Sequence, residues 1–225
     1  MGRGTSKAGR GSNTSLYKGL YVEGSAGQYQ KEADEIVRGT KDVLKDFGLN
    51  DEIRGVYFSP KGVMFGGEAQ ASMNGMGGLH ISTNYLARGN KDSKGFHVND
   101  TFYGTGAHEA GHAVVNGLLK KIDINPDDTN KSSGRKNLER ATARSKGKLE
   151  KAVIKEASKR YGSNPVISGY GSKNWKEKVA EAVSDVYSNG KKANPYSKEV
   201  VGVLKDISNG KFKPKIKVTK REMGI

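Results

Sequence analysis

The stretch His108-Glu109-Ala110-Gly111-His112 lies inside a longer apolar run, from Ala107 to Leu119, that predicts a single helix. Residues four apart lie on the same face of a helix, so His108 and His112 should project side by side. Two neutral imidazoles at this spacing can bind one zinc ion, and Glu109 can act as a base towards water at the metal without being a ligand. The alternative is a surface helix with two solvated histidines, which the apolar flanks disfavour.

The composition limits the class of protein. The chain has 225 residues, 34% of them hydrophobic, which is enough for one core or a core with appendages. A formal net charge of +15 favours contact with nucleic acid, acidic proteins or anionic membranes. The chain has no cysteine, so a zinc ion would have to be held by histidines and carboxylates. Because no run is apolar enough to span a membrane or to form a signal peptide, we expect a cytoplasmic or virion-associated protein.

The domain organisation follows from changes in composition. Residues 1–27 are rich in Gly, Ser, Lys and Arg and predict a flexible basic arm. Residues 28–210 form the expected domain, with a basic helical insertion at about 122–164. Its long helical stretch from Lys136 to Arg160 suits a solvated face better than nucleic-acid contact, because no aromatic residues are interleaved for stacking. Residues 211–225 predict an extended basic tail or an edge strand.

A helix and short strands are predicted before the histidine motif. Apolar residues recur at helical spacing from Gln28 to Phe47. The stretches Ile53–Phe58 and Gly62–Phe65 read as two strands, and the glycines between 66 and 78 match no phosphate-binding loop. Leu79–Tyr85 is the expected last strand, and the resemblance given below implies that it lies at the sheet edge, where an extended peptide could pair with it. An ordinary edge strand without that role fits the same residues.

The third metal ligand must come from a later element, because a catalytic zinc ion normally has three protein ligands and a water. A helix is predicted from Asn174 onward, and Glu177, Glu181 and Asp185 lie four apart on one of its faces. Three aligned carboxylates repel one another unless a cation or hydrogen-bond donors compensate. Either Glu177, or Glu181 with Asp185 behind it, could complete the site.

Three further features receive simpler interpretations. His80 and His97 are predicted to be ordinary surface or core residues, since nothing places either of them beside the motif. Asn194-Pro195 is a helix start signal, and the apolar residues that follow as far as Ile207 predict a helix packed on the preceding one.

The motif H-E-x-G-H, followed later by Y-G-x-x-N-x-x-E-x-x-A-E, resembles the gluzincin-type metallopeptidase domain of anthrax lethal factor and related zincin domains of phage and mobile-element proteins. The resemblance covers about 105–120 and 167–189. It implies an α+β, zincin-like fold with a small mixed sheet, an active-site helix and C-terminal helices. It also implies Glu177 as the third zinc ligand, Tyr170 facing the metal and Glu181 orienting a ligand histidine.

The expected function is zinc-dependent hydrolysis of a protein or peptide substrate. His108, His112 and Glu177 would hold zinc, Glu109 would be the general base, and Tyr170 would donate to the developing oxyanion. The alternative is a basic nucleic-acid-associated or virion-associated structural protein with a structural or inactive zinc site. In either case the basic helix and tail could contact nucleic acid or an acidic partner. A weaker possibility is a toxin-like effector that cleaves a host protein.

Overall fold

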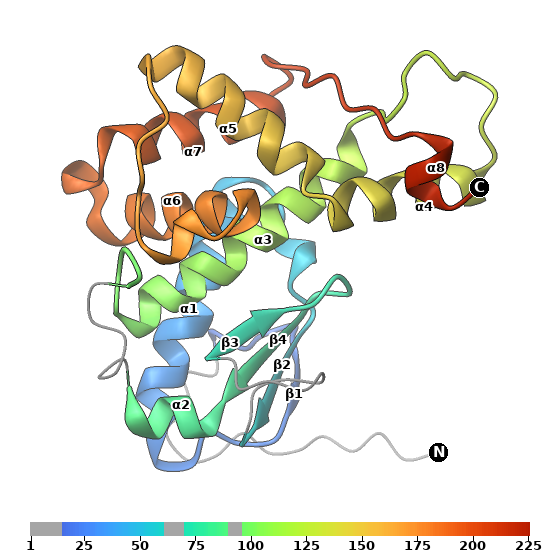
Figure 1. Ribbon diagram of the computed structural model, residues 1–225. Coiled ribbons are helices and arrows are strands. Elements are labelled where there is room, and N and C mark those ends of the chain that lie inside the picture. The colour runs from blue at the N-terminus through green and yellow to red at the C-terminus, as the bar shows by residue number, and fades with distance from the viewer. Residues whose placement is uncertain (1–14, 61–69, 90–95) are drawn as a thin grey trace, which may run out of the picture.

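The computed structural model describes residues 15–60, 70–89 and 96–225. Within these residues the fold is mixed α+β and mostly helical, with a small four-stranded mixed sheet, as the sequence predicts. Helix α3 lies between the part of the molecule that carries the sheet and a layer formed by α5, α6 and α7 (Figure 1). The elements in chain order are β1 (Tyr21–Glu23), α1 (Gln30–Asp46), β2 (Gly55–Ser59), β3 (Ala71–Met73), β4 (Gly78–Ser82), α2 (Thr83–Arg88), α3 (Phe102–Lys121), α4 (Ser133–Ser145), α5 (Lys148–Tyr161), α6 (Trp175–Asn189), α7 (Pro195–Ser208) and α8 (Lys220–Met223).

The strand order of the sheet is β1-β2-β4-β3, with β3 alone antiparallel to its neighbour. The prediction that Leu79–Tyr85 forms the edge strand is therefore wrong. β4 is central and ends at Ser82, whose hydroxyl accepts a hydrogen bond from the Tyr85 amide and caps α2. The edge strand is β3, which belongs to the predicted glycine-rich connection. The predicted strand Gly62–Phe65 lies outside the described residues.

Residues 15–27 belong to the domain rather than to an arm. β1 pairs in parallel with β2, which extends the sheet by one strand. The Tyr17 hydroxyl donates a hydrogen bond to the buried Asp34 of α1 at 2.9 Å. The predicted boundary at residue 27 is thus too late for this part of the chain, because β pairing and a buried tyrosine hold it. The rest of the predicted arm, residues 1–14, lies outside the described residues.

Helices α1 and α3 pack with their backbones close together. At Gly39 an added Cβ would collide with the Tyr103 carbonyl, and at Gly106 it would collide with the Ile36 carbonyl. The Thr40 hydroxyl also donates to the Gly106 carbonyl at 3.0 Å. Helix α3 is therefore fixed along the half that precedes His108.

The basic segment forms two helices, where the sequence predicts one long helical stretch. α4 and α5 are separated at Gly147, which has a left-handed backbone with φ of +59° that glycine adopts without strain. The apolar side of α5, including Leu149 and Val153, is buried, and α5 contacts α6 and α7. The segment predicted as an insertion is thus partly built into the core, because its broken apolar stripe finds partners there.

The C-terminal residues lie on the surface of α4 and the loop after α3. Asn125 accepts a hydrogen bond from the Val218 amide and donates one to its carbonyl, both at 2.9 Å. Ile216 and Met223 are buried. Residues 211–219 have no regular secondary structure, and they pair with no strand among the described residues.

Helix α7 begins and packs as the sequence predicts. Asn194 caps it, and α7 contacts α6. Among the helices of the described ranges, none is both long and apolar enough to cross a membrane.

Candidate metal centre

Helix α3 places both histidines of the motif. It begins after Thr101, whose hydroxyl accepts a hydrogen bond from the first turn at 2.9 Å. His108 is buried and His112 is half-buried, with 5.1 Å between their ring centroids. Gly111 lets helix α6 come close, because a Cβ at this position would lie only 2.9 Å from the Ala180 Cα. The close approach brings the first turn of α6 over the two histidines.

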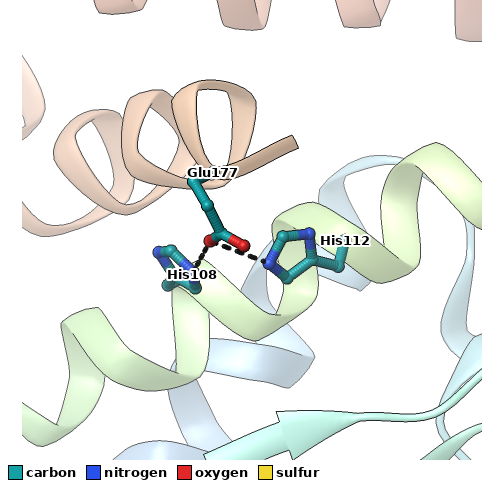
Figure 2. Close-up of side chains that lie close together, drawn as sticks. All are labelled: His108, His112 and Glu177. Carbon is teal, nitrogen blue, oxygen red and sulfur yellow. Dashed lines mark hydrogen bonds and ion pairs between the residues drawn. The ribbon is translucent and has the colours of Figure 1, made fainter. Parts of the chain in front are cut away.

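The third group comes from that first turn. Asn174 caps α6 by accepting hydrogen bonds from the amides of Lys176 and Glu177 at 2.9 and 3.1 Å. Glu177 Oε2 lies 3.2 Å from His108 Nε2 and 3.5 Å from His112 Nε2 (Figure 2). Since the ligand atoms of all three side chains lie within 4.8 Å of one another, they could hold one metal ion.

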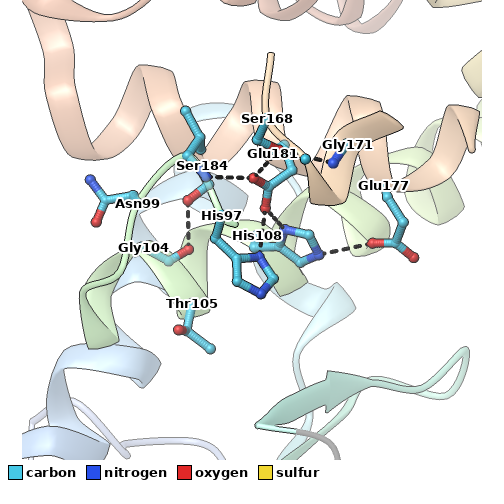
Figure 3. A network of polar contacts seen from close by, with 12 residues as sticks. His97, Asn99, Gly104, Thr105, His108, Ser168, Gly171, Glu177, Glu181 and Ser184 are labelled. Atoms are coloured by element: carbon cyan, nitrogen blue, oxygen red, sulfur yellow. Dashed lines mark hydrogen bonds and ion pairs between the residues drawn. The ribbon is translucent and has the colours of Figure 1, made fainter. Parts of the chain in front are cut away.

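Glu181, one turn further along α6, faces the other ring nitrogen of His108. Its carboxylate accepts hydrogen bonds from Nδ1 of His108 at 2.9 Å and from Nδ1 of His97 at 3.2 Å. The Ser168 hydroxyl donates to its second oxygen at 2.6 Å (Figure 3). The Val98 amide donates to the same oxygen at 2.7 Å. Four donors keep this buried carboxylate ionised, and through Nδ1 it fixes the orientation of the His108 ring.

Asp185 continues the acidic face of α6 but has a different role. It accepts hydrogen bonds from the Asn194 amide at 2.9 Å and from the Asn189 side chain at 2.8 Å. These contacts connect the end of α6 to the start of α7. Of the two arrangements that the sequence leaves open, the structure brings Glu177, and not Glu181 with Asp185, to the Nε2 atoms of the histidines.

Glu109 lies between the histidine pair and the sheet. Its Oε2 accepts a hydrogen bond from the Met73 amide on β3 at 2.9 Å. Burial raises the pKa of Glu109, while the neighbouring His112 and His108 act in the opposite direction. Glu109 is not one of the three converging residues, which leaves its carboxylate available to accept a proton.

Tyr170 lies in a short turn before α6, with its ring centroid 5.6 Å from that of His108. Its amide donates to the Phe96 carbonyl at 2.9 Å, and the Lys173 ammonium lies 4.2 Å from its ring centroid. Burial, followed by the charges of Glu177 and Glu109, raises the pKa of Tyr170 to about 12. The hydroxyl therefore remains a proton donor at neutral pH.

His97 is part of this cluster, although the sequence predicts an ordinary surface or core residue. Besides its contact with Glu181, its ring centroid lies 4.4 Å from that of Tyr170. The sequence carries no spacing signal for this contact, because His97 sits on an irregular segment before α3. His80 lies elsewhere, stacked on Tyr57 and 3.0 Å from the Asn74 side chain, as expected for a structural histidine.

Without a metal ion, the contacts of His108 with the carboxylates of Glu177 and Glu181 favour its protonated form. Burial lowers the pKa of His108, but the hydrogen bonds to Glu177 and Glu181 outweigh burial and raise it to about 10. Burial raises the pKa values of Glu177 and Glu181, but their contacts with the histidines hold both well below the ordinary value. Two anionic carboxylates thus surround a position where a cation is stabilised.

A cavity of about 310 Å³ borders the group on the side of the N-terminal half of α3. His108, Glu109 and Tyr170 line it, together with Thr105 and Lys173. The cavity is large enough for an amino-acid side chain next to the candidate reacting atoms.

Comparisons with protein-family models, with curated proteins and with solved structures find no match for this chain. The resemblance to gluzincin-type domains therefore rests on the residues of the two motifs, and the function has to be argued from the geometry of the site.

Proposed function

We propose that this protein is a zinc-dependent metallopeptidase of the gluzincin type with a zincin-like fold. The observation that carries the proposal is the convergence of His108, His112 and Glu177, with Glu109 next to them on α3. Two imidazole nitrogens and one carboxylate oxygen are a ligand set of catalytic zinc sites. Bound zinc would supply a Lewis acid that polarises the scissile carbonyl and lowers the pKa of water.

Glu109 would act as the general base. Its contact with the Met73 amide holds the carboxylate between β3 and the histidines. Burial raises the pKa of Glu109 above its ordinary value, and a carboxylate with a raised pKa is a better proton acceptor. Glu109 would take a proton from the attacking water and deliver it to the leaving nitrogen.

Tyr170, in the turn before α6, and Glu181, on α6, would support the reaction. Tyr170 keeps its proton and would donate a hydrogen bond to the oxygen that becomes negative in the transition state. Glu181 would hold the ring of His108 through Nδ1 and so direct Nε2 towards the metal position.

The substrate would lie along β3. The antiparallel strand β3 is the sheet edge next to α3, and on its other side it pairs with no strand among the described residues. An extended peptide can add to such an edge through main-chain hydrogen bonds. This would bring a peptide bond to Glu109, which contacts the same strand.

The direct test is Glu109→Gln, which removes the base but keeps the size of the side chain. We expect metal content equal to that of the parent and a loss of peptide hydrolysis of about 10²- to 10⁴-fold. Glu32→Gln, a partly exposed position on the first turn of α1, is the matched control and should hydrolyse peptides like the parent. Equal activity of Glu109→Gln and the control would contradict the assignment.

Tyr170→Phe tests the donor role. Removing one oxyanion donor costs about 3 kcal/mol, or roughly a hundredfold in turnover, with little effect on metal content. A variant that loses metal, or that keeps full turnover, would contradict this role.

The second candidate function is that of a nucleic-acid-associated or virion-associated structural protein. The surplus of Lys and Arg, 39 against 24 acidic residues, favours it. A salt-dependent affinity for DNA, combined with no hydrolysis of peptides, would support this function over the first.

A further inference from the structure

The helix face that carries the histidines continues beyond the metal group. Asn116 and Lys120 follow His112 at intervals of four residues, so they lie on the same side of α3. At the helical rise per residue, they lie about 6 and 12 Å beyond His112. Both border a second cavity, of about 350 Å³, whose opposite wall is α4 with Arg140 and Arg144.

The turn after the edge strand β3 lies next to Arg144, which lines the second cavity. Gly75 follows β3 in the turn towards β4, and a side chain at Gly75 would collide with the Arg144 guanidinium. Along the strand, Ala71 borders the first cavity, Met73 contacts Glu109, and Gly75 meets Arg144. A chain laid along β3 would therefore pass from one cavity to the other with the metal group between them.

This second cavity is cationic. Lys120, Arg140 and Arg144 line it, and no carboxylate does. Lys120 is paired with Glu52 at 2.7 Å, but neither Arg140 nor Arg144 forms an ion pair within the ranges that the structure describes. Among the described residues, the two guanidinium groups at this cavity thus have no carboxylate partner, and Arg140 donates only to the Lys120 carbonyl at 3.4 Å. A guanidinium binds a carboxylate through two parallel hydrogen bonds, which makes it selective for this group.

We propose that Arg140 and Arg144 bind an acidic side chain of the substrate, located two to four residues before the scissile bond. The inference rests on the proposed peptidase function. An antiparallel peptide on β3 would run from the Gly75 end towards the Ala71 end, so its N-terminal part would lie against Arg144. The second cavity is bordered by Asn116 and Lys120, about 6 and 12 Å beyond His112 along α3. At about 3.3 Å per extended residue, this distance corresponds to two to four residues before the scissile bond.

The test uses peptide hydroxamates, because a metal-binding hydroxamate fixes the register of the peptide. One series carries the hydroxamate at the C-terminal end and has Glu or Gln two, three or four residues before it. A second series carries it at the N-terminal end, with Glu or Gln after it. Affinities are measured by calorimetry on the zinc-loaded full chain. In the first series we expect Glu to bind roughly tenfold to a hundredfold tighter than Gln at one of these positions. In the second series we expect no such difference.

The double variant Arg140→Gln/Arg144→Gln should remove the preference, so that the Glu peptide binds no tighter than the Gln peptide. Lys151→Gln/Lys155→Gln is the control. It removes the same charge from exposed positions of α5 and should keep the preference. A preference that survives in the arginine variant, or is lost equally in the control, would overturn the inference.

The outcomes separate this inference from the proposed function. Binding of hydroxamates without any difference between Glu and Gln would overturn the acidic subsite alone. Failure of both series to bind the zinc-loaded chain would overturn the metal site and the subsite together. Loss of affinity for a single-stranded oligonucleotide in the arginine variant, with the peptide preference intact, would assign the two arginines to nucleic acid and overturn the inference.

Discussion

Helix α3 packs against α1 on one side and against α6 on the other, and the two contacts differ in kind. Towards α1, glycines let the two backbones come close, and Thr40 adds a hydrogen bond to the Gly106 carbonyl. Towards α6, Gly111 also allows close approach, but the contact carries charged groups, above all the half-buried Glu177 and the buried Glu181. Close backbone packing against α1 thus fixes the position of α3, whereas the contact with α6 brings carboxylates to the histidines of α3.

We therefore expect substitutions at the contact with α1 to affect stability and substitutions at the contact with α6 to affect function. Changes on the α1 side should lower the free energy of unfolding, because they force packed backbones apart. Changes on the α6 side should alter metal affinity more than stability, because they remove groups whose charge a metal ion needs.

The largest effect on the free energy of unfolding is expected from Gly106→Ala on the α1 side. The added methyl would overlap the Ile36 carbonyl, and overpacking of this kind costs about 1–3 kcal/mol. Chemical denaturation would measure the free energy of unfolding. Gly202→Ala is the matched control, since an added Cβ there meets nothing within 4 Å on helix α7. This control should be neutral or stabilising by up to about 1 kcal/mol. Equal stabilities of the two variants would contradict the close packing of α1 and α3.

A smaller effect is expected from Glu181→Gln on the α6 side. It removes the charge that holds the His108 ring, and loss of such an outer partner lowers metal affinity about 10- to 100-fold. Competition with a chelator would measure the zinc affinity, with Glu32→Gln on the first turn of α1 as the control. An unchanged affinity would mean that Glu181 supports the fold and not the metal group.

The smallest expected effect is on the pH dependence of zinc binding, because binding should release a proton from His108. The pKa of His108 is about 10 in the folded chain without metal, against about 6.5 in an unfolded chain. The stabilising effect of the proton is therefore complete below about pH 6.5 and is lost as the pH rises towards 10. Metal needs the neutral ring, so at pH 8 zinc binding should release about one proton from His108, and affinity should rise with pH.

Calorimetric titration of zinc in two buffers of different ionisation enthalpy would count the released protons. If binding at pH 8 releases none, the ion pairs of His108 with Glu177 and Glu181 are not present in the metal-free protein.

Long helices with clear patterns could be predicted from the sequence. α1, α3 and α7 have apolar faces that repeat over several turns, and α6 has Asn174 as a cap. Such signals are local, because a helix forms its hydrogen bonds within one segment. The positions of His108, His112 and Glu109 on one buried helix follow from the motif and its apolar flanks.

The features that the sequence did not predict depend on contacts between distant segments. β1 and β3 have three residues each and exist only through pairing with β2 and β4. Their identity as strands is therefore a tertiary property.

The same distinction between local patterns and contacts of distant segments applies to the residues of the candidate metal centre. Glu177 was singled out by the spacing of a second motif, whereas His97 reaches Glu181 through a segment without regular structure. No periodicity marks such a residue, so only the folded chain brings it to the site.

The central claim is that Glu177, and not Glu181, completes the metal group, and metal content tests it most directly. Mass spectrometry would be applied to protein purified without chelators or a histidine tag, after incubation with zinc and removal of the excess. We expect about one zinc ion per chain in the parent, as a group made of His108, His112 and Glu177 requires. We expect none in Glu177→Ala, and zinc retained with weaker affinity in Glu181→Ala. Zinc retained in Glu177→Ala but lost in Glu181→Ala, or a parent chain that binds no zinc, would contradict the account.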